Sequence, residues 1–167
     1  QRILTFLDPE SDPMGAGWNI MQSKIAMGSG GLFGKGFMGG TQSQLDFLPE
    51  KHTDFILVSL GEEFGFAGCM ILVGLYALVL LIGLAIALGA RSHFARITAL
   101  GLTMNFLAYI LINMSMVMGV IPVVGIPLPL VSYGGTAMLT VMMGFGILMS
   151  VHVHRQTEVP RQTGWLI

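Results

Sequence analysis

Two long stretches of the sequence, residues 64–90 and 97–154, contain no Asp, Glu, Lys or Arg. Neither stretch shows the polar face that a helix at the surface of a soluble domain carries. An uncharged apolar run of about 18 residues or more is typical of a transmembrane helix. The pattern therefore predicts an all-α integral membrane protein.

Interruptions in the apolar pattern divide these stretches into three membrane spans. We expect the spans at about residues 55–90, 97–119 and 136–151. The first is longer than the roughly 20 residues that cross a bilayer, so either this helix tilts or its first part, with Glu62 and Glu63, stands clear of the lipid. Residues 120–135 hold three prolines and three glycines and no charge. Because such a segment breaks helices and must be covered at membrane depth, we expect this Pro/Gly-rich loop to dip back among the spans.

Residues 1–54 form a long polar segment ahead of the first span. Within it, Trp18, Met21 and Ile25 are spaced almost as on one face of a helix, which predicts a short amphipathic helix. Residues 28–40 follow with seven glycines, a density that is typical of a loop. We therefore expect a large Gly-rich loop that contains one short helix.

Basic residues in the short connections predict the orientation in the membrane. Arg91 and Arg96 flank the turn between the first two spans, and Arg155 and Arg161 follow the third. We expect residues 91–96 and 152–167 to be cytoplasmic and residues 1–54 and 120–135 to be extracytoplasmic. An outer N-terminal segment requires an earlier span, and the chain begins with Gln1 rather than Met, so we expect a piece of a longer membrane protein.

Composition narrows the class of function. Hydrophobic residues make up 53% of the chain and charged residues 10%, with a net charge of −1, against about 25% charged residues in soluble domains. The balanced charge argues against a nucleic-acid partner. The single cysteine, Cys69, lies in an apolar run and is expected to be a small buried hydrophobic residue.

The glycine-rich stretch contains the pattern G-x-G-x-x-G, as GKGFMG in residues 34–39. No strand precedes it and no βαβ unit surrounds it, so we reject a dinucleotide site. The overlapping GGLFGKG lacks the first glycine and the Ser or Thr of a P-loop. One hypothesis is that N–H groups of this loop, with Lys24 or Lys35, hold a lipid-linked pyrophosphate. The alternative is a flexible surface loop.

The stretch FLPEKHTDFI, residues 47–56, gathers charge at the start of the first span. A carboxylate at this boundary, here Asp54, is partly desolvated, and the resulting rise in its pKa would suit a general base. The alternative is a helix N-cap, a role that Thr53 could also take. Lys51 and His52 are candidates for contacts with lipid headgroups.

Two further patterns are weighed against simpler explanations. SLGE, residues 59–62, matches a capping box, which predicts that Glu62 caps a helix start. HTD is too closely spaced for a metalloprotease motif, and the four histidines do not cluster along the chain, so the sequence assigns no metal site.

Four stretches carry a resemblance to a known family. They are DPESDPMGAGWNIMQSKIAMGSGGLFGKG, GTQSQLDFLPEKHTDFI, GEEFGFAG and GVIPVVGIPLPLVSYGGT. In content and order they resemble the SEDS family (shape, elongation, division, sporulation), from about Leu7 to Arg155. GTQSQLDFLPE and PVVGIPLPL are closer to the elongation branch than to the division branch, which shares the HTDF and LPLVSYGG patterns.

The resemblance implies a peptidoglycan glycosyltransferase with ten spans, of which this chain supplies the large outer loop and the last three. Such enzymes polymerise lipid II, a disaccharide peptide on undecaprenyl pyrophosphate, at the outer face of the bacterial cytoplasmic (inner) membrane. The elongation branch maintains cell shape with a class B penicillin-binding protein as its transpeptidase partner. A lipid II flippase, a scaffold for that partner, and the division-specific branch remain as alternatives.

By the same resemblance, Asp54 matches the aspartate that the family requires for activity, and we interpret it as the general base. The residues expected to contact the substrate are Glu50, Lys51, His52, Lys24, Lys35, Ser132 and Tyr133. Positive charge on the leaving pyrophosphate would come from Lys51, Lys24 or Lys35, in that order, or from a divalent cation such as Mg²⁺ or Mn²⁺. The polyprenyl tail would need a groove that faces the lipid.

Overall fold

The computed structural model describes residues 16–36, 39, 56–122 and 124–156. Its helices over these residues are α2 (Ala16–Ser29), α4 (Ile56–Gly89), α5 (His93–Val117) and α6 (Gly135–Val153). Three of them, α4, α5 and α6, are long and apolar enough to cross a membrane. The predicted all-α membrane fold is confirmed for this part of the chain.

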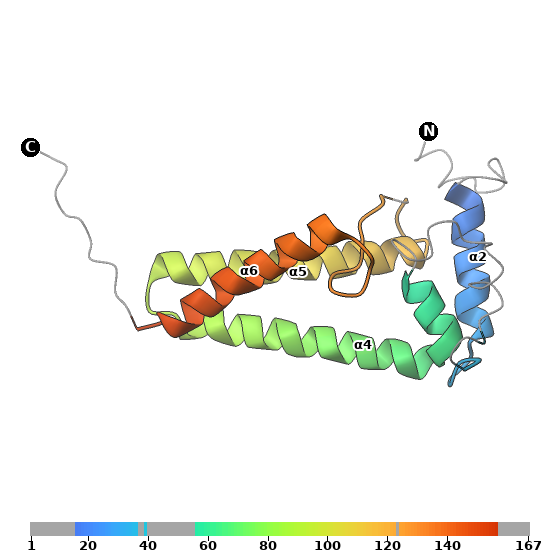
Figure 1. The fold of residues 1–167 in the computed structure, drawn as a ribbon, viewed down its shortest axis with the longest axis horizontal. Coiled ribbons are helices and arrows are strands. Elements are labelled where there is room, and N and C mark those ends of the chain that lie inside the picture. The colour runs from blue at the N-terminus through green and yellow to red at the C-terminus, as the bar shows by residue number, and fades with distance from the viewer. Residues whose placement is uncertain (1–15, 37–38, 40–55, 123, 157–167) are drawn as a thin grey trace, which may run out of the picture.

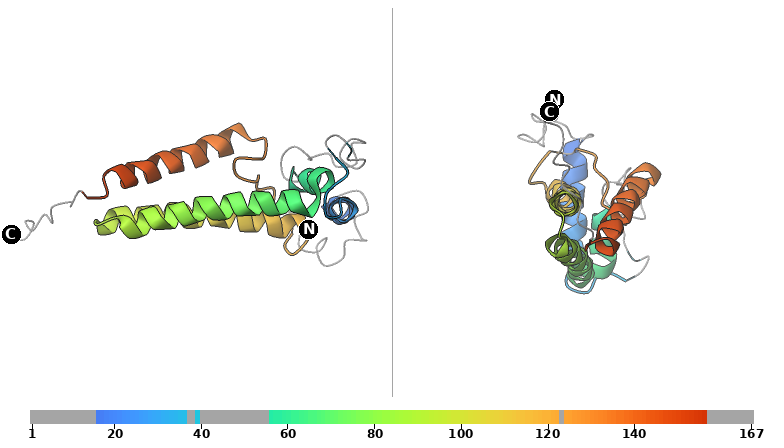
Figure 2. Two further views of the ribbon diagram at one scale, coloured as in Figure 1. Left: turned by 90° about the horizontal axis from the view of Figure 1, so that it is seen from below. Right: turned by 90° about the vertical axis from the view of Figure 1, so that its left-hand side faces the viewer.

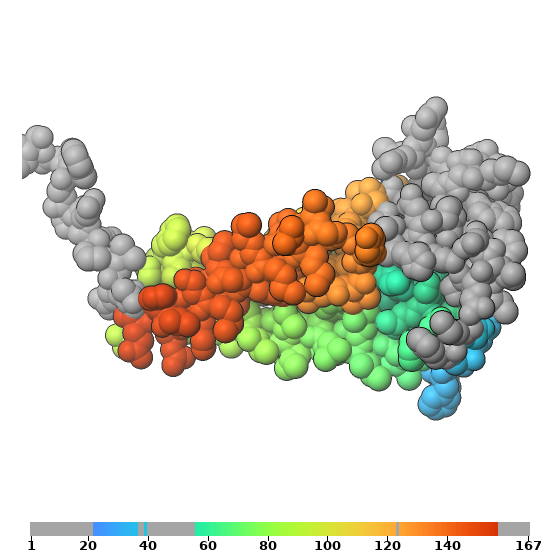
Figure 3. Space-filling view, in the orientation of Figure 1, coloured from blue at the N-terminus to red at the C-terminus, as the bar shows by residue number. Residues whose placement is uncertain are grey.

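The two longest helices, α4 and α5, run side by side in opposite directions along the long axis of the molecule (Figure 1). Helix α6 lies obliquely across this pair, and its distance from α4 changes along its length (Figure 2). Helix α2 crosses the end where α4 begins and α5 ends (Figure 1). The loop that follows α2 projects past α4 in the space-filling view (Figure 3), and Phe33 in that loop is 86% exposed.

One aromatic residue from each spanning helix meets in the centre of the bundle. Tyr76 of α4 and Phe106 of α5 are both buried, and their rings make an edge-to-face contact with centroids 5.9 Å apart. Phe106 also packs on Phe145 of α6, with the ring centroids 5.3 Å apart. Such pairs stabilise by about 0.5–1.5 kcal/mol beyond their buried area, so this stack is a main link between the three helices.

Helix α4 is interrupted at Gly65, whose φ of 65° and ψ of −162° are not helical. The break separates a short first segment, residues 56–64, from a second segment, residues 66–89. At 1.5 Å per residue the second segment is about 36 Å long, which covers a hydrocarbon core of about 30 Å. The first turns of α4 run at an angle to the rest of the helix (Figure 1). This arrangement fits the expectation that the first part of the helix stands clear of the lipid better than a tilt of one continuous helix.

The turn between α4 and α5 and the end of α6 lie together at the far end of the bundle from α2. The backbone N–H of Arg91 donates to the carbonyl of Arg155 over 3.1 Å, and the guanidinium of Arg96 donates to the carbonyl of Ala90 over 3.0 Å. Three of the four arginines used to predict orientation therefore share one end. The fourth, Arg161, lies outside the described residues.

A helix is present where the sequence predicts one before the glycine-rich loop, and small residues form the part of it that is buried. Ile25 is 51% exposed, whereas Ser23 and Ala26 are buried. Small residues let two helix backbones approach closely, and α2 packs against α4. The apolar spacing therefore located the helix, while the amphipathic character of its face stays a prediction. The side chains of Trp18 and Met21 are outside the described set.

Candidate functional site at the break in α4

The break in α4 removes at least two hydrogen bonds from the helix. In a continuous helix the N–H groups of Phe66 and Ala67 would donate to the carbonyls of Glu62 and Glu63. Gly65 turns the chain away from this geometry, which leaves two donors and two acceptors without helical partners. A buried polar group without a partner costs about 1–3 kcal/mol, so these four groups need substitutes.

The glycine-rich loop provides a substitute for each of the four groups. Phe66 N donates to Gly31 O over 3.0 Å, and Ala67 N donates to Leu32 O over 3.1 Å. In the other direction, Lys35 N donates to Glu62 O over 3.0 Å, and Gly36 N donates to Glu63 O over 3.1 Å. We call residues 30–36 together with residues 61–67 the loop–helix junction.

Several glycines of the junction are required by this close approach. A Cβ atom on Gly30 would collide with the carbonyl oxygen of Gly61, and one on Gly34 with that of Glu63. A Cβ on Gly65 would collide with the N–H of Gly34. The φ and ψ of Gly65 also lie in a region that is essentially restricted to glycine. The glycines predicted a loop, and the structure shows that they also permit backbone-to-backbone contact.

An ion pair joins the side chains of the junction. Lys35 Nζ lies 2.9 Å from Glu62 Oε1, with the glutamate side chain fully buried and the lysine side chain 30% exposed. A buried carboxylate needs a charged or hydrogen-bonding partner to offset its desolvation. The loop and the helix are therefore joined by side chains as well as by backbone.

The Pro/Gly-rich loop forms a second packed element at the same end of the bundle. Tyr76 OH donates to Pro129 O over 2.6 Å, and Asn113 Nδ2 donates to Ile126 O over 2.7 Å. Within the loop, Leu128 N donates to Ser132 Oγ over 2.8 Å, and Leu128 is 1% exposed. The loop dips back among the helices as predicted, and side chains of α4 and α5 hold it there.

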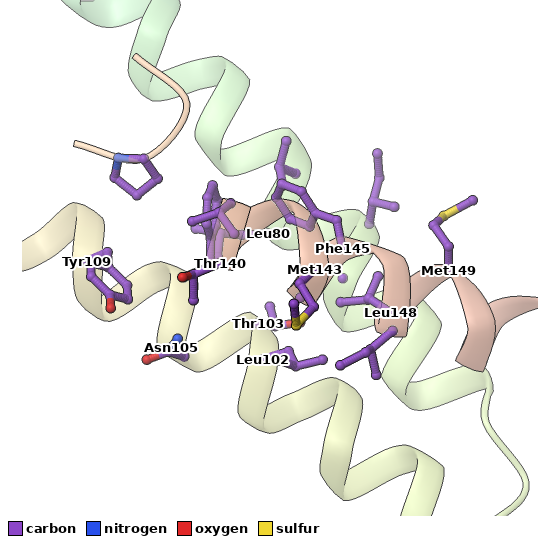
Figure 4. A pocket seen from close by; sticks show the side chains of 18 of the residues that line it. Leu80, Leu102, Thr103, Asn105, Tyr109, Thr140, Met143, Phe145, Leu148 and Met149 are labelled. Atoms are coloured by element: carbon purple, nitrogen blue, oxygen red, sulfur yellow. The ribbon is translucent and has the colours of Figure 1, made fainter. Parts of the chain in front are cut away.

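A groove of about 500 Å³ lies between α4, α5 and α6 and ends at the Pro/Gly-rich loop (Figure 4). Its wall is mainly aliphatic and aromatic. The polar side chains that line it are Thr103, Asn105, Tyr109 and Thr140. Its size and apolar wall are suited to a hydrocarbon chain rather than to a sugar or a phosphate.

Comparison with protein families identifies the chain. The family model described as "Cell cycle protein", which unites FtsW, RodA and SpoVE, matches residues 1–157. The chain belongs to the FtsW/RodA/SpoVE family. The family predicted from the sequence motifs is thereby confirmed.

Individual members of the FtsW/RodA/SpoVE family show the same relationship. The chain is 58% identical to the peptidoglycan glycosyltransferase MrdB of Escherichia coli K12, over 93% of this chain and 42% of that protein. It is 46% identical to the peptidoglycan glycosyltransferase RodA of Treponema pallidum, over 92% of this chain and 36% of that protein. It is 44% identical to the probable peptidoglycan glycosyltransferase FtsW of Trichlorobacter lovleyi, over 90% of this chain and 39% of that protein. The chain thus spans about two fifths of the length of these relatives.

Two solved structures of the family share the fold. One is a chain from a study of how a peptidoglycan synthase complex coordinates polymerization and crosslinking, with a TM-score of 0.74, 30% identity, and coverage of 94% of this chain and 42% of that one. The other is an Asp-to-Ala variant of the rod shape-determining protein RodA of Thermus thermophilus, with a TM-score of 0.64, 33% identity, and coverage of 81% and 41%.

The predicted site residues fall into two groups. Glu50, Lys51, His52 and Asp54 lie outside the described residues, and their roles stay predictions. Lys24, Lys35, Ser132 and Tyr133 are described. Among these, Lys24 and Tyr133 are exposed, Tyr133 by 82%, whereas Lys35 is in the ion pair and Ser132 is buried within its own loop.

The glycine loop does not present the N–H groups that a pyrophosphate would need at residues 34–36. Gly34 N donates to Gly30 O over 2.8 Å, and the next two N–H groups donate to carbonyls of α4. The N–H groups of residues 34–36 are therefore engaged within the protein, and the hypothesis that other N–H groups of the glycine-rich loop hold a pyrophosphate stays a prediction. A contact between the Lys35 side chain and the substrate stays a prediction.

Sequence reasoning missed the part that Glu62 plays in the junction. The capping-box interpretation is wrong because α4 begins at Ile56, three residues before Ser59, so Glu62 lies well inside the helix. One signal was available: an ionisable residue at the edge of an apolar span is expected to have a partner. The sequence offered no way to choose Lys35 as that partner, since the two residues are 27 positions apart.

Proposed function

We propose that the protein to which this chain belongs polymerises lipid II into glycan strands during cell elongation, with Asp54 as the general base. The observation that carries the proposal is the high identity, over almost the whole chain, to relatives named peptidoglycan glycosyltransferase. The elongation role is supported by the 58% identity to MrdB, against 44% to FtsW.

The proposed reaction joins two lipid-linked sugars. The 4-hydroxyl group of a GlcNAc attacks C1 of the MurNAc at the end of another chain, and the bond from C1 to the pyrophosphate oxygen breaks. Asp54 accepts the proton of the attacking hydroxyl, a contribution of typically 10²- to 10⁴-fold. The electron pair of the broken bond leaves with undecaprenyl pyrophosphate, so the leaving group needs no general acid. Attack from the opposite face inverts the anomeric carbon, by analogy with inverting glycosidases.

The position of Asp54 in the chain supports this role. It precedes Ile56, where α4 begins, by two residues in the sequence, and the start of α4 lies at the end of the bundle that holds the junction and the Pro/Gly-rich loop (Figure 1). With the arginine-rich turn assigned to the cytoplasm by the orientation rule, this end faces outward. A sugar carried on a membrane lipid would be presented at this boundary, while its tail could lie in the apolar groove.

Positive charge for the leaving pyrophosphate is proposed to come from Lys51 or Lys24, because the Lys35 ammonium is bound to Glu62. A Mg²⁺ or Mn²⁺ ion is a further candidate. Among residues 16–36, 39, 56–122 and 124–156, no group of three or more His, Cys, Asp or Glu could hold a metal ion. Glu50 and Asp54, outside that set, together with the substrate's own pyrophosphate, are the candidate ligands for such an ion.

The proposed partner is a class B penicillin-binding protein, which would crosslink the strands that this protein polymerises in the bacterial cytoplasmic membrane. A solved relative comes from a synthase complex that coordinates these two steps. No nucleic acid is involved in this scheme, and the other contacts are with membrane lipids.

The test is lipid II polymerisation by the full-length protein with its transpeptidase partner. Asp54→Asn keeps the size of the side chain and removes the base, so we expect product to fall at least about 100-fold. Asp46→Asn makes the same change in the same loop and serves as the matched control. Normal polymer from Asp54→Asn would disprove the catalytic assignment, and lipid II translocation without polymer would favour a flippase.

A further inference from the structure

We propose that Lys35 and Glu62 are positioning residues: their ion pair holds the first segment of α4, residues 56–64, at a fixed angle to the membrane-spanning part. The proposal rests on the proposed function, because this segment is the one into which Asp54 leads. It gives the ion pair a role in setting the geometry of catalysis, distinct from contact with the substrate.

The first segment of α4 needs an external constraint. A helix keeps its direction through hydrogen bonds between successive turns, and two of these are missing across Gly65. Without the loop, residues 56–64 would be held by the packing of Leu57 and Val58 in the core and would join the span through a glycine that can adopt many conformations. Gly65 is therefore the point at which the angle between the two segments is set.

The junction supplies this constraint from a single short loop. Its four backbone hydrogen bonds span the break on both sides: two reach carbonyls of the first segment, and two accept from N–H groups of the second. A loop bonded to both segments fixes the angle between them. The ion pair then ties the side chain of Lys35, at the end of the loop, to the last full turn before the break.

Burial strengthens the interaction between the two charges of this ion pair. The Glu62 side chain is fully buried, so its charge is weakly screened and its attraction to Lys35 is strong. Loss of the cation leaves a buried carboxylate without this partner, whereas replacement of both charges does not. Lys35→Met should therefore be more harmful than the double variant Lys35→Met/Glu62→Gln.

A positioning role and a substrate-binding role predict different kinetics. If the pair positions Asp54, then Lys35→Met and Glu62→Gln should both lower kcat, by about 10-fold or more, with little change in KM for lipid II. If Lys35 instead contacts the pyrophosphate, Lys35→Met should change KM while Glu62→Gln leaves the kinetics normal. That second outcome would overturn the proposal.

The structural measurement is amide hydrogen exchange in the full-length protein. We expect Glu62→Gln and Lys35→Met to speed exchange in peptides covering residues 30–36 and 56–67 and to leave α5 and α6 unchanged, because the loss is local. Glu63→Gln, the same change one residue away, should leave exchange and turnover normal. Lys35→Arg keeps the charge and should retain most of both. Faster exchange across α5 and α6 as well would indicate general destabilisation and refute a specific positioning role.

The two proposals can fail separately. If Asp54→Asn retains polymerisation, the catalytic assignment falls, but hydrogen exchange still decides whether the ion pair holds the junction. If exchange at residues 56–67 is unchanged in Glu62→Gln and Lys35→Met, the positioning role is wrong whatever Asp54 does. Faster local exchange with normal kcat would show that the angle of the segment does not matter for turnover, and would also refute it.

Discussion

The hydroxyl group of Tyr76, in the middle of α4, donates a hydrogen bond of 2.6 Å to the carbonyl oxygen of Pro129, 53 residues further along the chain. Each proline lacks a backbone N–H and cannot continue a helix, so side chains that bond to this loop help to fix its place. This bond and the one from Asn113 to Ile126 set it here.

We expect Tyr76→Phe to loosen the Pro/Gly-rich loop. The ring and its contact with Phe106 remain, but the carbonyl of Pro129 loses its donor, at a cost of about 1 kcal/mol. The midpoint of thermal unfolding of the full-length protein in detergent should fall. Tyr109→Phe, the same change on α5, is the control, and equal midpoints for the two variants would contradict the assigned importance of the bond.

Gly65→Ala should be strongly destabilising and Gly74→Ala should not, although both residues lie in α4. Gly65 has a backbone conformation that is essentially restricted to glycine, and a Cβ there would meet Gly34, so we expect a loss of about 1–3 kcal/mol or more. Gly74 has open space around it, and alanine is favoured over glycine inside a helix by about 0.5–1 kcal/mol. Thermal unfolding of both variants should show opposite shifts, and a parallel shift would count against the break as described.

Gly83→Ala tests the contact between α4 and α5. A Cβ at this position would lie 2.6 Å from Thr103 Oγ1 and 3.0 Å from its Cγ2, and overpacking of this kind costs about 1–3 kcal/mol. Thr103→Ala removes both atoms, so the double variant should be more stable than Gly83→Ala alone. Strict additivity of the two changes would mean that the helices do not touch at this point.

Ser132→Ala separates a structural role from a substrate contact. Its hydroxyl accepts from the N–H of the buried Leu128, so its loss should lower the thermal midpoint, with a cost of about 1–3 kcal/mol. Ser150→Ala, at an exposed position of α6, should leave the midpoint unchanged. A higher KM for lipid II at normal stability would instead support the substrate contact predicted from the family resemblance.

The sequence was sufficient for the fold because membrane spans are marked by local composition. Residues 64–90 and 97–154 lack charge, and these stretches contain all of α6 and most of α4 and α5, although α4 begins eight residues earlier, at Ile56. The interruption by Pro122, Pro127 and Pro129 likewise separates α5 from α6, because proline acts on its own neighbourhood.

The junction could not be predicted because it depends on contacts between distant parts of the chain. Glu62 lies in a sequence that matches a capping box, and this local pattern gave the wrong interpretation because the helix had already begun. Gly34 and Gly65 are needed for their approach to each other, and nothing in either neighbourhood indicates that the other is near. The role of Asp54 came from the family resemblance, since physics alone left a general base and a helix cap as alternatives.

The junction also has a consequence for the order of events during synthesis. Lys35 leaves the ribosome 27 residues ahead of Glu62, which at about 5–20 residues per second is a delay of about 1–5 seconds. For that interval the glycine loop lacks its four backbone hydrogen bonds to α4 and its ion pair, because the partners of these bonds belong to the next helix. The hydrogen bonds and the ion pair of the junction can form only after the first turns of α4 have emerged. Folding of this end of the protein is therefore coupled to the insertion of α4.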